Sequence, residues 1–202
     1  MNNLEKLKNG GCFIAGTVIF TDEGKEEIED IQVGDYVYAR DQYGDNQDYK
    51  EVTRVFIREK YILIHLVIDG ETIITTEEHP FYIEGDGFVE ASELEVGDLA
   101  ETADGETVSI ESVEVEYLEE PVTVYNFEVE DYHTYYVGDT EVLVHNLSPH
   151  LSKSIKDYLN GKKDNVSYLD CLWGELYGSI NADFWSGVIS EEQADYLRTK
   201  YL

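Results

Sequence analysis

Short runs of hydrophobic residues that alternate with polar ones, separated by turn residues, dominate the chain from about residue 12 to residue 146. The runs are rich in β-branched and aromatic residues, and turn signals recur roughly every 8–12 residues, a pattern that predicts an all-β domain. From residue 147 onward the hydrophobic period becomes helical, and residues 169–180 carry one broad apolar stripe at helix spacing. We therefore expect three short helices in residues 147–202, the first of which would end at about Leu159, closed by Asn160-Gly161.

A five-residue pattern occurs twice within the β region. Residues 31–35 read IQVGD, and residues 94–98 read LEVGD. The recurrence predicts a duplicated β-subdomain folded back on itself, and chance combined with common turn chemistry is the alternative.

The charge of the chain changes at the same place as its hydrophobic period. Residues 1–146 hold 8 Lys and Arg against 36 Asp and Glu, a net charge of −28, whereas residues 147–202 hold 6 against 8, a net charge of −2. An acidic surface of this density repels phosphate backbones, so nucleic-acid binding is disfavoured. With 42% hydrophobic residues the chain can bury a core, and it contains neither an apolar run of membrane-spanning length nor a secretory signal.

The β region ends in a histidine and an asparagine. The side-chain amide of Asn146 can attack its own main-chain carbonyl, which forms a succinimide and breaks the bond to Leu147. His145 next to it, and His133 at another strand end, can donate or accept the protons that this attack needs. By itself, a His-Asn pair also fits a strand end followed by a turn.

The same region begins at a cysteine that follows a flexible Asn-Gly-Gly stretch. The sulfur of Cys12 can attack the Gly11 carbonyl and shift the acyl group from nitrogen to sulfur. Because an amide is more stable than a thioester, the site must polarise this bond and protonate the departing nitrogen. Thr76 and His79, at the end of a β-branched run, are available for this, and Pro80 directly after them is expected to stop the strand and fix a turn.

The remaining cysteine and histidines have plainer interpretations. His65 alternates with apolar neighbours as an ordinary strand residue, Cys171 lies beside the helical stripe as a core or boundary residue, and His150 is a surface residue. Metal-ligand spacing is absent, so a metal-binding β-protein is a weak hypothesis, and we expect no cofactor.

In their order along the chain, these motifs resemble those of the Hint family, which comprises intein, bacterial intein-like and hedgehog autoprocessing domains. The motifs are CFIAGT at 12–17, IQVGD at 31–35, TEEHPF at 76–81, YNFEV at 125–129, His133 and VLVHN at 142–146. The resemblance covers residues 12–146 and implies a mainly β, horseshoe-like fold with a pseudo-two-fold. A short leader, residues 1–11, would precede it and a small helical domain of unknown function, residues 147–202, would follow.

The resemblance also implies a self-acting, single-turnover function whose substrates are the chain's own flanks, residues 1–11 and 147–202. It implies an N–S acyl shift at Gly11–Cys12 and asparagine cyclisation at Asn146–Leu147. The residues implied to be catalytic are Cys12, Thr76, His79, His133, His145 and Asn146.

Two positions depart from the pattern of splicing inteins. The residue after the terminal asparagine, a Cys, Ser or Thr in those proteins, is Leu147 here, which favours cleavage over ligation. Asn126 stands where many inteins have an Asp that coordinates the two steps, and this puts tight coupling in doubt because Asn cannot titrate near neutral pH. Non-splicing forms of this kind resemble the intein-like domains of bacterial polymorphic-toxin precursors, whereas the hedgehog branch has no need of a His-Asn ending.

A second hypothesis, from another functional class, is an inactive Hint scaffold that presents the helical tail to a protein partner. A decayed domain would be expected to lose some of the six catalytic residues, and all six are present. The localisation stays open between the bacterial cytoplasm and export within a larger system.

Overall fold

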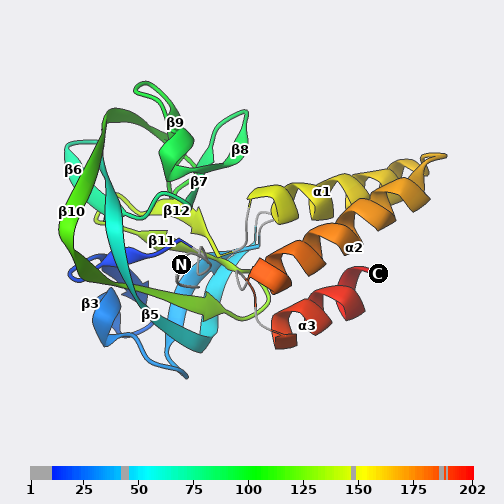
Figure 1. Cartoon of the computed structure of the whole chain (residues 1–202), viewed down its shortest axis with the longest axis horizontal. Coiled ribbons are helices and arrows are strands. Elements are labelled where there is room, and N and C mark those ends of the chain that lie inside the picture. The colour runs from blue at the N-terminus through cyan, green and yellow to red at the C-terminus, as the bar shows by residue number, and fades with distance from the viewer. Residues whose placement is uncertain (1–10, 42–45, 147–148, 187–188, 190) are drawn as a thin grey trace, which may run out of the picture. The chain divides into compact units, whose positions relative to one another are not determined.

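The computed structural model describes residues 11–41, 46–146, 149–186, 189 and 191–202. The chain divides into two compact units, and one of them covers Gly11–Asn146. This unit is built mainly of strands, and the α-helices belong to the other unit (Figure 1). The predicted leader up to residue 10, and Leu147, lie outside the described residues.

The described part of the first unit contains twelve strands and two short 3-10 helices. The strands are β1 (Phe13–Ile14), β2 (Val18–Thr21), β3 (Gly24–Glu27), β4 (Tyr36–Arg40), β5 (Gln47–Ile68), β6 (Glu71–Thr75), β7 (Pro80–Ile83), β8 (Gly87–Glu90), β9 (Leu99–Glu101), β10 (Thr107–Val129), β11 (Thr134–Val137) and β12 (Val142–His145). The 3-10 helices are η1 (Ile28–Asp30) and η2 (Ala91–Glu93).

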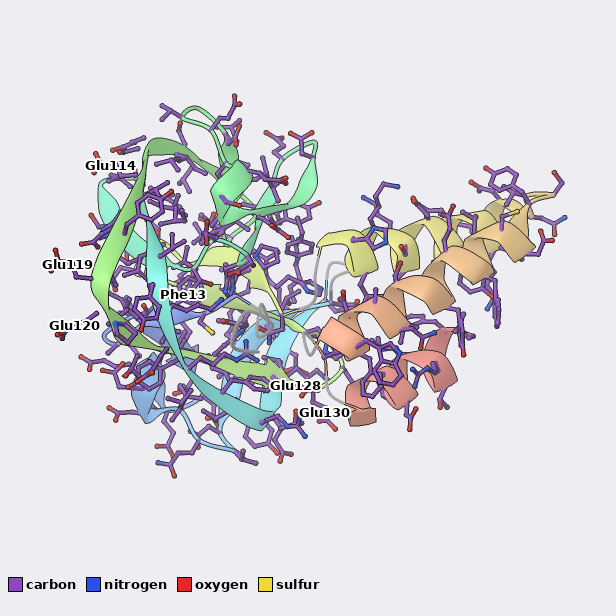
Figure 2. All side chains as sticks on the ribbon, viewed as in Figure 1. Phe13, Glu114, Glu119, Glu120, Glu128 and Glu130 are labelled. Atoms are coloured by element: carbon purple, nitrogen blue, oxygen red, sulfur yellow. The ribbon has the colours of Figure 1, made fainter. Side chains whose placement is uncertain are left out.

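Two long antiparallel strands, β5 and β10, form a ribbon that runs through the whole β unit (Figure 1). Their pairing extends from Ile110↔Ile68 to Val129↔Val52 and is interrupted by three register shifts. Such bulges increase the local twist of a ribbon. The acidic side chains Glu114, Glu119 and Glu120 project outward from β10 (Figure 2).

The two copies of the Val-Gly-Asp pattern form the same turn. In the first, the Gln32 amide donates to the Asp35 carboxylate and the Gly34 amide to the Val52 carbonyl. In the second, the Glu95 amide donates to the Asp98 carboxylate and the Gly97 amide to the Ile110 carbonyl. Both glycines have φ near +100°, at +99° and +101°, a backbone conformation that residues with a side chain rarely adopt. Each turn also follows a 3-10 helix and precedes a short strand, so the repeat extends beyond the five residues.

The core of the β unit is made of aliphatic and aromatic side chains from both halves. Strands β11 and β12 are buried at all four positions, so they lack the polar face of an ordinary antiparallel strand. The largest fully buried side chains of the unit are Tyr135, Tyr136, Phe13, Phe81, Phe127, Ile19, Ile28, Ile64, Leu66, Ile68, Ile110 and Leu143.

The second unit contains α1 (Pro149–Asp164), α2 (Leu169–Ser186) and α3 (Glu191–Tyr201). The apolar stripe expected on residues 169–180 is only partly used, because Leu176 and Ile180 are buried whereas Trp173 and Tyr177 stay exposed and stack on each other. Cys171, expected at the core or its boundary, is exposed as well. None of the helices in the described residues is long and apolar enough to cross a membrane.

The prediction of a mainly β domain followed by a small helical domain is confirmed.

Candidate active site

The peptide bond between Gly11 and Cys12 is buried and held by hydrogen bonds on both sides. The Cys12 amide donates to the hydroxyl oxygen of Thr76 at 3.0 Å, and the side-chain amide of Asn126 donates to the Gly11 carbonyl oxygen at 2.6 Å. The Cys12 carbonyl in turn accepts from the Thr76 amide and the Thr75 hydroxyl, each at 2.9 Å. The carbonyl oxygen, on which charge would develop in an N–S acyl shift, and the amide nitrogen, which would depart, therefore each face a specific side chain.

This geometry follows from the position of β1 between β6 and β10. Phe13 pairs with Thr75 on β6 and with Tyr125 on β10. Strand β6 ends at Thr75. The His79 amide then donates a hydrogen bond to the Thr76 carbonyl, which closes a turn before Pro80 begins β7. The turn predicted from the Thr-x-x-His-Pro sequence is therefore present, and it lies against the start of the β unit.

His79 packs directly on Gly11. A Cβ atom added at Gly11 would overlap the Cα and Nδ1 atoms of His79, so only glycine fits before the cysteine. The His79 ring is fully buried among aromatic side chains, 4.2 Å from the Phe13 ring and 6.2 Å from the Tyr135 ring by centroid. Burial lowers the pKa of His79 to about 3, although the backbone of Gly11 opposes this shift. The imidazole is thus neutral at pH 7, with one nitrogen able to donate a proton and one able to accept one.

The Cys12 thiol lies in a small apolar cluster with Leu63 and Val124. Burial raises the pKa of this thiol, while the charge of Arg58 and a hydrogen bond from it act in the opposite direction. Arg58 pairs with Val124 across β5 and β10, which places both side chains on the face where Cys12 packs. Lys60, two residues along the same strand, lowers the thiol pKa further.

Sequence reasoning missed these basic side chains. A weak signal existed, because Arg58 and Lys60 are two of only 8 basic residues in the first 146 and are spaced for one face of a strand.

Replacing Arg58 by glutamine should raise the pKa of the Cys12 thiol, because a positive charge that favours the thiolate is removed. The thiolate absorbance would be followed against pH in a Cys171→Ser, Asn146→Ala background, where Cys12 is the only thiol. Arg54→Gln, on the same strand, is the matched control and should leave the titration unchanged. Equal titration curves for the two variants would remove Arg58 from the site.

At the C-terminal border of the β unit, the β11–β12 hairpin places Asn146 against His133. The Asn146 amide donates to the His133 carbonyl at 2.8 Å, and its side-chain amide donates to the Phe127 carbonyl at 2.6 Å. His133 is buried and has φ of +57°, a left-handed conformation that costs a non-glycine residue roughly 1–2 kcal/mol. His145 is fully buried, and its ring lies 4.5 Å from that of Phe88.

Strand β10 contacts both borders of the β unit, the one at Gly11–Cys12 and the one at Asn146. Asn126 contacts Gly11, and the next residue, Phe127, contacts Asn146. The structure thus gathers Cys12, Thr76 and His79 around the first border. It places His133, His145 and Asn146 around the second. His65, by contrast, lies elsewhere on β5, with its ring nitrogen 2.7 Å from the carboxylate of Glu116 on β10.

Among the described residues, no group of three or more His, Cys, Asp or Glu side chains lies close enough together to hold a metal ion.

A model of the pretoxin Hint domain matches residues 18–147, well over half of the chain. The chain belongs to the pretoxin Hint domain family. The match includes five of the six candidate catalytic residues and begins after Cys12. The comparison with curated proteins gives no match.

Solved structures give the same result for this Hint domain. The bacterial intein-like domain from Clostridium thermocellum is 46% identical, with 66% of this chain and 97% of that chain covered and a TM-score of 0.65. The gp41-1 intein is 28% identical, with 68% and 99% covered and a TM-score of 0.56. A DnaB intein from Synechocystis sp. PCC 6803, at 20% identity, 67% and 97% coverage and a TM-score of 0.57, shares the fold. The predicted Hint resemblance is confirmed, and the fold is that of autoprocessing or splicing-type domains.

Proposed function

We propose that this Hint domain breaks its own backbone at Gly11–Cys12 and at Asn146–Leu147 and so releases residues 147–202. In this proposal residues 12–146 are the catalyst, and residues 1–11 and 147–202 are its flanks. The observation that carries the proposal is the pair of hydrogen bonds on the Gly11–Cys12 peptide, from Asn126 to its oxygen and from its nitrogen to Thr76.

In the first step, the Cys12 sulfur attacks the Gly11 carbonyl carbon. A carbon–sulfur bond forms, negative charge develops on the Gly11 oxygen, and the bond to the Cys12 nitrogen then breaks. The proton lost by the sulfur ends on that nitrogen, so the step consumes none. Neutral His79 can pass this proton, and the Thr76 hydroxyl, which faces the nitrogen, can deliver one as its lone pair develops.

In the second step, the Asn146 side-chain nitrogen attacks the carbonyl carbon of the same residue. The new carbon–nitrogen bond closes a succinimide, the bond to Leu147 breaks, and one proton moves from the attacking nitrogen to the leaving one. The hydrogen bond from the side chain to the Phe127 carbonyl restrains the attacking amide. We assign this proton transfer to His133, whose carbonyl accepts from the Asn146 amide, and to His145, the residue before Asn146.

Cleavage is favoured over ligation because Leu147 offers no nucleophile to accept the acyl group. An acyl group held on Cys12 then passes to water or to an added thiol, and the flanks are not joined.

Expressing residues 1–202 and following the intact mass over hours tests the proposal. We expect a fragment that begins at Leu147 and a partner that ends in a succinimide or in Asn146. A chain that stays whole, also with thiol added, would leave only the scaffold hypothesis.

A further inference from the structure

Asn126 uses both ends of its side-chain amide. Its oxygen accepts from the Phe127 amide at 2.7 Å and from the Tyr135 hydroxyl at 2.8 Å, while its nitrogen donates to the Gly11 carbonyl oxygen at 2.6 Å. The side chain is 5% exposed and the Tyr135 ring is fully buried. This network extends from β10 and β11 to the peptide bond that precedes β1.

The hydrogen-bond partners fix which way the amide points. In the opposite orientation the Asn126 nitrogen would face the Phe127 N–H, two donors in contact, and the oxygen would face the Gly11 oxygen, two acceptors in contact. Burial also raises the pKa of Tyr135 well above its ordinary value, so its hydroxyl keeps its proton and donates it. The nitrogen of Asn126 therefore faces Gly11.

We propose that Asn126 is an oxyanion-stabilising catalytic residue for attack at Gly11, and that Tyr135 is the positioning residue that aims it. This inference rests on the proposed acyl shift. As the Cys12 sulfur adds to the carbonyl, charge builds on the oxygen that Asn126 already contacts. A fixed donor at such an atom stabilises the transition state without reorganisation, most effectively where water is excluded.

Buried aromatic side chains around Asn126 exclude water from this site. Phe127 and Tyr135 lie 4.3 Å apart by ring centroid, Phe13 packs on Tyr135 at 6.4 Å, and all three are fully buried. In such a site a carboxylate at position 126 would place negative charge against the developing oxyanion, whereas a neutral amide donates at any pH near neutrality. Asn126 is thus suited to a role that an ionised aspartate cannot take.

The test measures dithiothreitol-induced loss of residues 1–11 from the 202-residue chain, with Asn146→Ala present to remove the second cleavage. Asn126→Leu keeps the approximate volume and removes the donor, and we expect it to slow release by about 100- to 1,000-fold. Tyr135→Phe should slow it less, because the Phe127 amide still orients Asn126. A rate for folded Asn126→Leu equal to that of the parent would overturn the proposal.

Asn126→Asp separates an oxyanion role from a structural one. Its rate relative to the parent should be low at pH 8 and should rise as the pH falls, because a protonated carboxyl donates where a carboxylate cannot. Because a carboxylate at position 126 would itself raise the pKa of the Cys12 thiol, the thiolate absorbance of both proteins is followed against pH in a Cys171→Ser background, and each rate is divided by its thiolate fraction before the ratio is taken. A ratio that stays flat with pH would contradict the proposal even if Asn126→Leu did not fold.

Two controls distinguish failure of the inference about Asn126 from failure of the proposed function. If the parent itself loses no residues 1–11 with dithiothreitol, the acyl shift fails and the inference with it. In chains that retain Asn146, release of residues 147–202 reports that each Asn126 variant is folded, since that reaction does not use the Gly11 oxygen.

Discussion

Replacing Asn146 by alanine should abolish the release of residues 147–202, with a loss of more than about 1,000-fold in rate, because the nucleophile is removed. The alanine has no amide to donate to the Phe127 carbonyl and none to close a succinimide. The measurement is the intact mass of the chain over the period in which wild type goes to completion.

The matched control is Asn160→Ala on the exposed side of α1, which should release the fragment at the wild-type rate. Asn146→Gln is the sharper variant. It keeps an amide that can reach the Phe127 carbonyl but would have to close a six-membered ring, so we expect a large loss here as well. Release from Asn146→Ala at an unchanged rate would mean that another group or an external protease breaks this bond.

The parts of the fold that were predictable depend on neighbours in the sequence. The Val-Gly-Asp turn is closed by an aspartate three residues after the amide it binds, as Gln32 and Asp35 show, and its glycine has a positive φ. The Thr-x-x-His-Pro turn is closed by the His79 amide and the Thr76 carbonyl in the same local manner. Short-range patterns of this kind can be read without knowing the fold.

The parts that were missed depend on strand register. Asn126 meets Gly11 across 115 positions, and Arg58 reaches Cys12 only because β5, β10 and β1 are adjacent in one order. No local pattern specifies which residues of a 22-residue strand and a 23-residue strand will face each other. Position 126 was interpreted by the residue that usually occupies it, whereas its hydrogen bonds indicate a donor and not a weakened acid.

In the helical unit, by contrast, a local sequence pattern gives a wrong helix boundary. The Asn160-Gly161 pair suggested a helix end, but α1 continues to Asp164. Gly161 is instead a point of close approach, because a Cβ there would press on the Leu172 side chain of α2. The helix ends before Asn165, which adopts the left-handed conformation typical of a C-terminal cap.

Replacing Cys12 by alanine should abolish thiol-induced loss of residues 1–11, because no sulfur remains to take the acyl group from Gly11. Wild type treated with dithiothreitol should lose this segment at a rate that rises with thiol concentration. The exposed Cys171 offers the matched control, and Cys171→Ala should behave as wild type. An equal thiol response in Cys12→Ala and wild type would remove the thioester step.

The Cys12→Ala chain also tests how far the two borders depend on each other. Asn126 and Phe127 are adjacent on β10, yet they contact the two borders through different atoms, a side-chain amide and a main-chain carbonyl. Neither group changes charge near neutral pH, so a completed acyl shift has no titratable link by which to trigger cyclisation. Release of residues 147–202 should therefore continue in Cys12→Ala within a few-fold of the wild-type rate. Strict loss of that release would mean that the thioester itself, through a rearrangement of β10, prepares Asn146 for attack.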